Sequence, residues 1–169
     1  MKNITSTFIT RTWLLAVLAI TFLSLGLAGA QADDHSLLMS FNEYLCPDPD
    51  CNSLDGNITL TGAFSERGTR HEDFDVIHVN HDGSQVVVAG TSTITTASGT
   101  MTTQWRGTIY FDNATFDSTL LAYIEGTESV TGGTGAYAGA TGHGTFEATL
   151  DYTNGNVLGV FEADVHLRH

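Results

Sequence analysis

Lysine, proline and cysteine are scarce in this chain of 169 residues, and helical patterning is missing. Lys2 is the only lysine, and the chain holds two prolines and two cysteines. No window places apolar residues at helical spacing, which argues against a helical bundle. The chain also has no phosphate-binding loop, nucleophile elbow or zinc-protease helix, so the sequence signatures of many nucleotide-binding and hydrolytic enzymes are absent.

Positive charge is almost absent beyond the N-terminal segment. All nineteen acidic residues follow residue 32, where the bases are four arginines, so this part carries 4 − 19 = −15 formal charges. Such a surface favours solubility outside the cell and repels nucleic acid and anionic membranes. We therefore expect no nucleic-acid partner. A saline habitat is a second explanation of the acidity. The four bases are Arg67, Arg70, Arg106 and Arg168.

Residues 1–32 have the pattern of a secretory signal peptide. Lys2 and Arg11 precede an apolar run from Trp13 to Leu27, and small residues end at Ala32. A membrane anchor would need about 20 apolar residues, and this run is shorter. We predict cleavage after Ala32 and a secreted or periplasmic domain over 33–169. No second apolar run of membrane length follows, so we expect no integral membrane segment after cleavage.

The two cysteines lie close together, with Pro47-Asp48-Pro49-Asp50 between Cys46 and Cys51. In an exported protein this spacing predicts a disulfide. Closing so small a ring lowers the conformational entropy of the unfolded chain by an amount worth only about 2 kcal/mol of stability. The bond would therefore fix one loop. A zinc site at the two thiolates would lack further ligands. A calcium site at the nearby aspartates would not match the residue spacing of a known calcium-binding loop.

The dominant period along residues 33–169 is two. From Met101 to Asp112, apolar side chains alternate with polar ones, which is typical of a half-buried strand. Turn-forming residues separate such runs, and Asn154-Gly155 is the strongest turn. The sequence therefore predicts one all-β domain, either a sandwich or a barrel. Further strands are expected over 37–41, 58–64, 76–79, 86–96, 116–125, 145–152 and 157–168.

One segment, from Val130 to Phe146, is unusually rich in glycine and runs into an alternating strand. Glycine permits positive φ and close approach of two backbones, and within strands it marks bulges and bends. We therefore interpret this segment as a structural turn and bend, with no part in chemistry. Its glycines are Gly132, Gly133, Gly135, Gly139, Gly142 and Gly144.

The same segment carries a family resemblance. Thr131-Gly132-Gly133-Thr134-Gly135, then Tyr137, then Ala138 to Gly144 resembles the glycine signature of barrels related to allene oxide cyclase and dirigent proteins. The match covers residues 100–165. The resemblance implies an eight-stranded antiparallel barrel with an apolar lumen, often in dimers or trimers, and no metal or organic cofactor. The family's working side chains cannot be aligned here, so none is carried over.

Candidate reactive residues are few. His71, His78 and His81 lie close in sequence, but His78 and His81 would point to opposite faces of a strand, so we expect solvated loop histidines and no metal site. Glu43 and His78 fall on faces that hold apolar residues. Inside a barrel they could move protons, but both lie near strand ends, which favours positions at the rim.

The sequence favours a non-catalytic barrel that binds a small apolar ligand or mediates self-assembly into a homo-oligomer. The alternative is a cofactor-free isomerase or cyclase, or a dirigent-type guide for radical coupling, and it follows from the resemblance alone. Sequons at Asn57 and Asn113 matter only in a eukaryotic secretory pathway.

Overall fold

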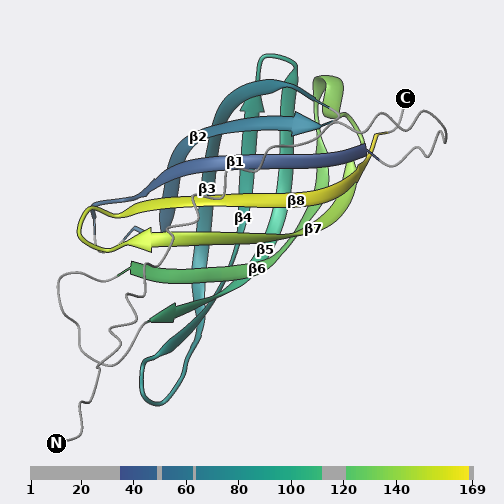
Figure 1. The fold of residues 1–169 in the computed structure, drawn as a ribbon. Helices are drawn as coiled ribbons and strands as arrows, with labels where there is room; N and C mark the ends of the chain where they lie inside the picture. The colour runs from purple at the N-terminus through teal and green to yellow at the C-terminus, as the bar shows by residue number, and fades with distance from the viewer. Residues whose placement is uncertain (1–34, 49–50, 63, 112–120, 168–169) are drawn as a thin grey trace, which may run out of the picture. The chain divides into compact units, whose positions relative to one another are not determined.

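A computed structural model describes residues 35–48, 51–62, 64–111 and 121–167, which form a closed antiparallel barrel (Figure 1). Neighbouring strands follow the chain order, and β1 closes the barrel by pairing with β8. The predicted all-β class and the eight-stranded barrel are therefore confirmed. The strands are β1 (His35–Leu45), β2 (Ser53–Gly62), β3 (Glu66–Val79), β4 (Gln85–Thr96), β5 (Gly99–Phe111), β6 (Leu121–Gly133), β7 (Thr141–Asp151) and β8 (Asn156–His166).

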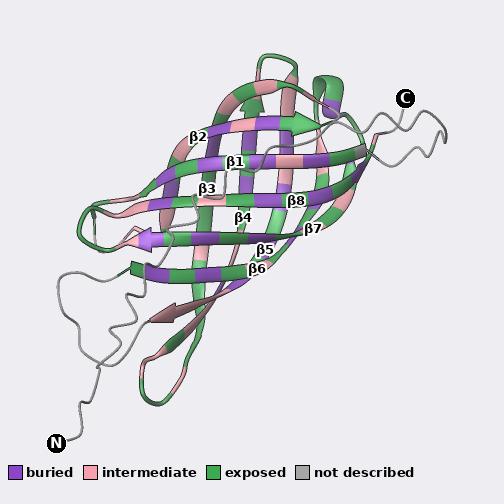
Figure 2. Ribbon diagram, viewed as in Figure 1, coloured by how far each residue is buried: buried purple, intermediate pink, exposed green. Residues whose placement is uncertain are grey.

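Alternation along each strand separates the lumen from the outer surface, as the banding in Figure 2 shows. In β5, Met101, Thr103 and Trp105 are buried, while the alternate residues Gln104 and Arg106 are exposed. Successive side chains of a strand point to opposite faces, so one set fills the barrel and the other meets water. The period of two in the sequence thus gave the inward residues of β5 correctly.

Strand β3 is much longer than the sequence indicated. Residues 76–79 were expected to form a short strand, but β3 begins at Glu66 and pairs with both β2 and β4. The prediction of a loop histidine is therefore wrong for His71, which lies in this strand, whereas His78 lies within the range expected as a strand; both side chains are exposed, as expected. His81 is exposed in the turn that follows.

The glycine-rich segment closes one end of the barrel. A 3₁₀ turn, η1 (Gly135–Tyr137), follows β6 and places Tyr137 in the core without solvent exposure. Gly135 and Gly139 adopt φ of 60° and 70°, a region that L side chains rarely enter. Gly142 and Gly144 lie against the β8 backbone, where a Cβ would meet the carbonyl oxygens of Asp164 and Glu162.

The half of the barrel next to η1 is densely packed. Six of its inward side chains, from the start of β1 and β5 and the ends of β2, β4 and β8, are no more than 1 % exposed. Side chains packed to this extent leave no room for a ligand at this end of the lumen. They are Leu37, Met39, Leu60, Ile94, Met101 and Val165.

The predicted disulfide is present and joins Cys46, just after β1, to Cys51, just before β2. The two Cα atoms are 6.0 Å apart. The bond lies at the end of the barrel opposite η1, where Leu45 N donates to Gly155 O. The predicted signal peptide and Asn113 lie outside the described residues, and Asn57 is exposed on β2.

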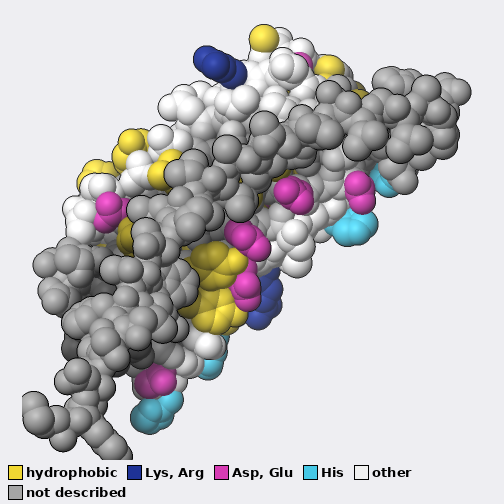
Figure 3. Space-filling model, viewed as in Figure 1, with side chains coloured by type: hydrophobic (Ala, Val, Ile, Leu, Met, Phe, Trp, Pro, Cys, Tyr) yellow, Lys and Arg dark blue, Asp and Glu magenta, His cyan; other side chains and the backbone are white. Residues whose placement is uncertain are grey.

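The outer surface mixes acidic and hydrophobic side chains. On the face drawn in Figure 3, Asp and Glu side chains are scattered among hydrophobic and uncharged ones. Several large hydrophobic side chains are more than 40 % exposed, among them Leu121, Tyr123, Leu158 and Val160. Within the described part of the chain, no helix has the length and apolar character needed to cross a bilayer.

Candidate functional site in the barrel lumen

The middle of the lumen is polar and charged. Six polar side chains are at least 96 % buried at inward positions, although the strands around them are mostly apolar inside. The uniformly apolar lumen that the family resemblance implied is therefore wrong for this chain. The six residues are Glu43, Arg70, Glu72, Ser92, Thr103 and Glu128.

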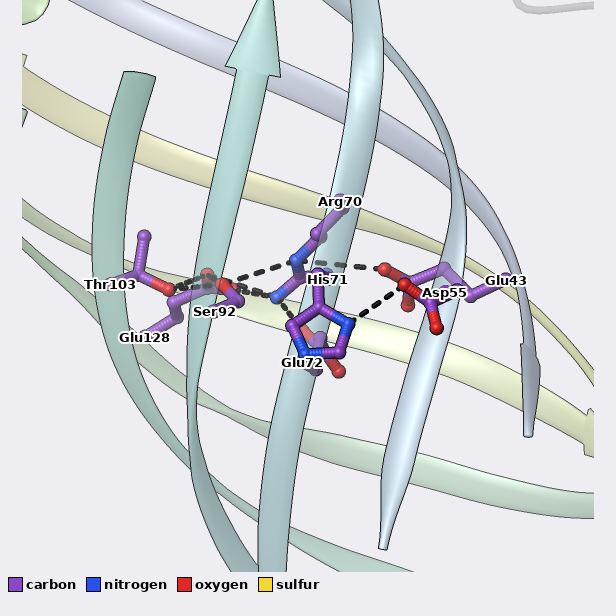
Figure 4. Close-up of polar contacts among 8 residues, drawn as sticks. All are labelled: Glu43, Asp55, Arg70, His71, Glu72, Ser92, Thr103 and Glu128. Carbon is purple, nitrogen blue, oxygen red and sulfur yellow. Dashed lines mark hydrogen bonds and ion pairs between the residues drawn. The ribbon is translucent and has the colours of Figure 1, made fainter. Parts of the chain in front are cut away.

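Arg70, on β3, is the only base of this cluster, and one side of its guanidinium is held by Glu128 of β6 (Figure 4). Arg70 Nη2 donates to Oε1 and Oε2 of Glu128 at 3.0 Å each. Thr103 Oγ1 donates to Glu128 Oε1 at 2.6 Å, and Arg70 Nε donates to Ser92 Oγ at 3.3 Å. Charge-assisted bonds of this kind are strong, so this half of the cluster is well anchored.

The other side of the guanidinium faces Glu72 and Glu43, and these carboxyls are less well satisfied (Figure 4). Glu72 Oε1 forms an ion pair with Arg70 Nη2, but not in hydrogen-bond geometry. Glu43 Oε1 lies 3.7 Å from Arg70 Nε, which is an ion-pair distance and too long for a hydrogen bond. Neither oxygen of Glu43 has a hydrogen-bond partner among the described residues.

Glycines on the inner wall make room for these large side chains. A Cβ on Gly56 would lie 2.2 Å from the Asn42 carbonyl oxygen and 2.6 Å from Cγ of Glu43. One on Gly90 would lie 2.2 Å from the Asp73 carbonyl oxygen and 3.0 Å from the ring of Trp105. A Cβ on Gly126 would lie 2.5 Å from the ring of Phe146. The missing side chains on β2, β4 and β6 therefore let charged and aromatic groups share a narrow barrel.

Three carboxyls face one guanidinium, so the cluster cannot be neutral when all of its groups are ionised. Burial, partly offset by the charge of Arg70, raises the pKa of Glu43 to about 7 and that of Glu72 to about 8. Burial alone would lower the pKa of Arg70, but the three carboxylates raise it above its ordinary value. Glu43 and Glu72 therefore change charge near neutral pH.

A cavity of about 60 Å³ lies beside Glu43, Arg70 and Glu72, on the side away from η1. This volume equals that of roughly two water molecules in the liquid. Apart from the three charged residues, its walls are apolar or aromatic, and Trp105 Nε1 is buried there without a hydrogen-bond partner among the described residues. The apolar lining is Phe41, Leu45, Leu54, Phe74, Val88, Trp105, Ile109, Ile124, Phe146, Ala148, Leu150 and Val157.

Of the two candidates from the sequence, Glu43 belongs to this site and His78 does not. Glu43 is 1 % exposed and lines the cavity, so the expected position at the rim is wrong for it. His78 is exposed beyond a β-bulge that follows Val76, and the bulge breaks the alternation on which its inward placement rested. The pair is therefore not brought together.

The structure does not bring His71, His78 and His81 together as a metal site. His71 Nδ1 lies 2.7 Å from Asp55 Oδ1, and its Nε2 lies 3.6 Å from Asp73 Oδ2, on the outside of β3. The hydrogen bond to Asp55 raises the pKa of His71. In the described ranges, no three His, Cys, Asp or Glu side chains are placed to hold a metal ion.

Sequence reasoning missed Arg70, Ser92, Thr103 and Glu128, and it considered Glu72 only beside the histidines. A usable signal existed for Glu128, because continuing the alternation from Ala122 and Ile124 leads to an inward position at 128. For Arg70 and Glu72 the signal was weaker, since their strand has few apolar residues on its inner face.

Comparisons with known proteins found no significant match to this chain. No protein-family model matches the chain, and neither a curated protein nor a solved structure is significantly similar to it.

Proposed function

We propose that this barrel is a binding protein whose lumen takes one small molecule with an apolar body and a polar head. The packed half next to η1 closes the lumen at one end, and the cavity occupies the other half. Its apolar walls favour a hydrophobic ligand body, while three charged groups at its inner end fix the orientation of the head. Apolar pockets with a few convergent polar groups are typical of ligand sites.

The observation that carries this proposal is the state of Glu43. Its side chain is 1 % exposed, borders the cavity and accepts no hydrogen bond from any described residue. A buried polar group without a partner costs free energy, about 1–3 kcal/mol and more for a charged group. A ligand head that forms hydrogen bonds with Glu43 would offset that cost. If Glu43 had only a structural role, the cost would remain.

Tryptophan fluorescence offers a direct test, because Trp105 lines the cavity and Trp13 is the only other tryptophan. In the W13F variant of the full chain, all indole emission comes from Trp105. Titration with small alcohols and amines should shift this emission in a saturable way, and the melting temperature should rise with ligand concentration. If no such compound changes either signal up to its solubility limit, the lumen is not a binding site.

A second candidate, proton-transfer catalysis of the isomerase type, is favoured by one observation. A carboxyl with a pKa of about 7, as burial gives Glu43, is suited to both accept and donate a proton near neutral pH. The resemblance of residues 131–144 to the cyclase family agrees with this alternative. It predicts that the protein incorporates deuterium from heavy water into a small unsaturated ketone such as cyclohexenone. Loss of incorporation in E43Q, measured by mass spectrometry, would separate catalysis from binding alone.

A further inference from the structure

Among the described residues, the cavity is lined by three buried carboxyl oxygens and one indole N–H, that of Trp105, for which no hydrogen bond is formed. Glu43 Oε1, Glu43 Oε2 and Glu72 Oε1 are buried carboxyl oxygens with no hydrogen bond from the described residues. Both residues line the cavity. When ionised, a carboxylate only accepts hydrogen bonds, so the group that completes this site has to supply several donors.

We propose that the head of the ligand is a primary ammonium group, carried on a slender, unbranched apolar chain. This inference rests on the proposed binding in the lumen and names the class of ligand. An ammonium has three N–H donors and no acceptor, so it can donate to both oxygens of Glu43 and also to Glu72, which already forms an ion pair with Arg70. A hydroxyl has a single donor, and a carboxylate has none and would be repelled.

The charge balance of the cluster points the same way. Glu43 on β1, Glu72 on β3 and Glu128 on β6 face one cation, Arg70, and Asp55 on β2 adds further negative potential at Glu43. Glu128 and Arg70 satisfy each other through two bonds of 3.0 Å. A second cation would therefore act on Glu43 and Glu72, whose charges are otherwise unbalanced. It would favour their ionised forms and displace protons.

The cavity sets the shape of the ligand. A volume of about 60 Å³ admits an ammonium with its first carbon atoms, and the walls beyond are apolar and aromatic. Phe41 already lies 4.9 Å from the Arg70 guanidinium carbon, so its ring tolerates a neighbouring cation. The Trp105 indole N–H is a donor, so an ammonium leaves it without a hydrogen-bond partner.

Three probes of nearly equal size test the inference: n-butylammonium chloride, 1-butanol and sodium butyrate. Each is titrated into the full-length protein at pH 8.5, with calorimetry and the emission of Trp105 in the W13F variant as readouts. We expect the amine to bind at least about tenfold more tightly than the alcohol, because charge-assisted bonds replace neutral ones. Butyrate should show no saturable binding.

Two variants and one further measurement locate the effect. E43Q should reduce the preference for the amine over the alcohol about tenfold, while E162Q, the same change on the exposed face of β8, should leave it unaltered. Calorimetry of the unmodified chain at pH 7 in two buffers of different ionisation enthalpy should show proton release with the amine and none with the alcohol. This measurement needs no variant, so it decides the matter even if E43Q does not fold.

The outcomes separate this inference from the proposed function. If alcohol and amine bind equally well, or if the amine releases no protons, the ammonium assignment is wrong and lumen binding stands. If all three probes leave the heat, the Trp105 emission and the melting temperature unchanged, the lumen holds only water, and both ideas fail.

Discussion

At the scale of single residues, one guanidinium organises the interior of the barrel. Arg70 contacts Glu43, Glu72 and Glu128, which come from three different strands. Buried ion pairs of this kind are poor evidence of net stabilisation, because both partners lose their hydration. Removing one partner is nevertheless costly, since the others stay buried without compensation.

Arg70→Met should therefore lower the free energy of unfolding by about 3–5 kcal/mol at pH 7. The loss should be smaller at pH 5, where Glu43 and Glu72, whose pKa values burial raises, are protonated. Urea unfolding at both pH values measures the effect. Arg67→Met on the same strand is the control, and its exposed side chain should cost less than about 0.5 kcal/mol. A loss below 1 kcal/mol at both pH values would contradict this account of the cluster.

At the scale of secondary structure, the inner wall depends on which glycines have room for a side chain. A Cβ on Gly126, in β6, would lie 2.3 Å from the Arg106 carbonyl oxygen and 2.5 Å from the ring of Phe146, whereas one on Gly132 in the same strand would meet only Thr102 Oγ1, at 3.6 Å. A side chain at position 126 would be sterically crowded, whereas one at position 132 would make an ordinary van der Waals contact. Neither has a positive φ, so space alone distinguishes them.

Gly126→Ala should destabilise the barrel by about 1–3 kcal/mol through overpacking, and Gly132→Ala should change stability by less than about 1 kcal/mol. Thermal unfolding of the two variants measures the difference. In the Gly126→Ala background, Phe146→Leu should restore only the part of the loss that is due to the ring, because the contact between the new methyl group and the Arg106 carbonyl oxygen remains. Equal effects of the two alanines would show that Phe146 does not limit this position.

The elements also show why the sequence revealed some strands and not others. Inward residues of β5 and β8 are mostly apolar, and their period of two was visible. In β3, Arg70 and Glu72 occupy inward positions, so hydrophobic alternation disappears where the charged cluster lies. The buried charged cluster thus removes the hydrophobic alternation from which its own strand could be predicted.

At the scale of the whole molecule, pH should control stability through the buried carboxyls. The ordinary pKa of Glu is 4.5, and burial raises it to about 7 in Glu43 and about 8 in Glu72. Between the ordinary pKa of 4.5 and these raised values, the folded protein binds more protons than the unfolded chain. The free energy of unfolding therefore falls as pH rises through this range. His71, whose pKa is raised by Asp55, contributes with the same sign as pH rises above its ordinary value of 6.5.

We therefore expect the free energy of unfolding to decrease from pH 5 to pH 8.5. The double variant E43Q/E72Q should reduce this slope and leave only the part due to His71, because glutamine does not titrate. Urea unfolding at four pH values measures the slopes, with E162Q as the control. An unchanged slope in the double variant would mean that Glu43 and Glu72 are ionised throughout this range.

The barrel closure itself was less accessible to sequence reasoning than the strands. Alternation and turns left sandwich and barrel open, and the eight-stranded form followed from the resemblance of the glycine-rich segment. Pairing of β1 with β8 joins residues more than 100 positions apart, and no local pattern encodes such a contact. The placement of Glu43 beside Arg70 depends on this closure, so it could not be inferred strand by strand.

Reliance on a single buried arginine also restricts how such a lumen can diversify. A substitution at position 70 alone leaves acidic side chains on three β-strands buried without a counter-charge. Loss of Glu128 alone removes the carboxylate that holds the guanidinium in place. We expect substitutions in this cluster to be tolerated mainly as compensating pairs. In related sequences, residues at positions 70 and 128 should accordingly covary, with charge appearing or vanishing at both together.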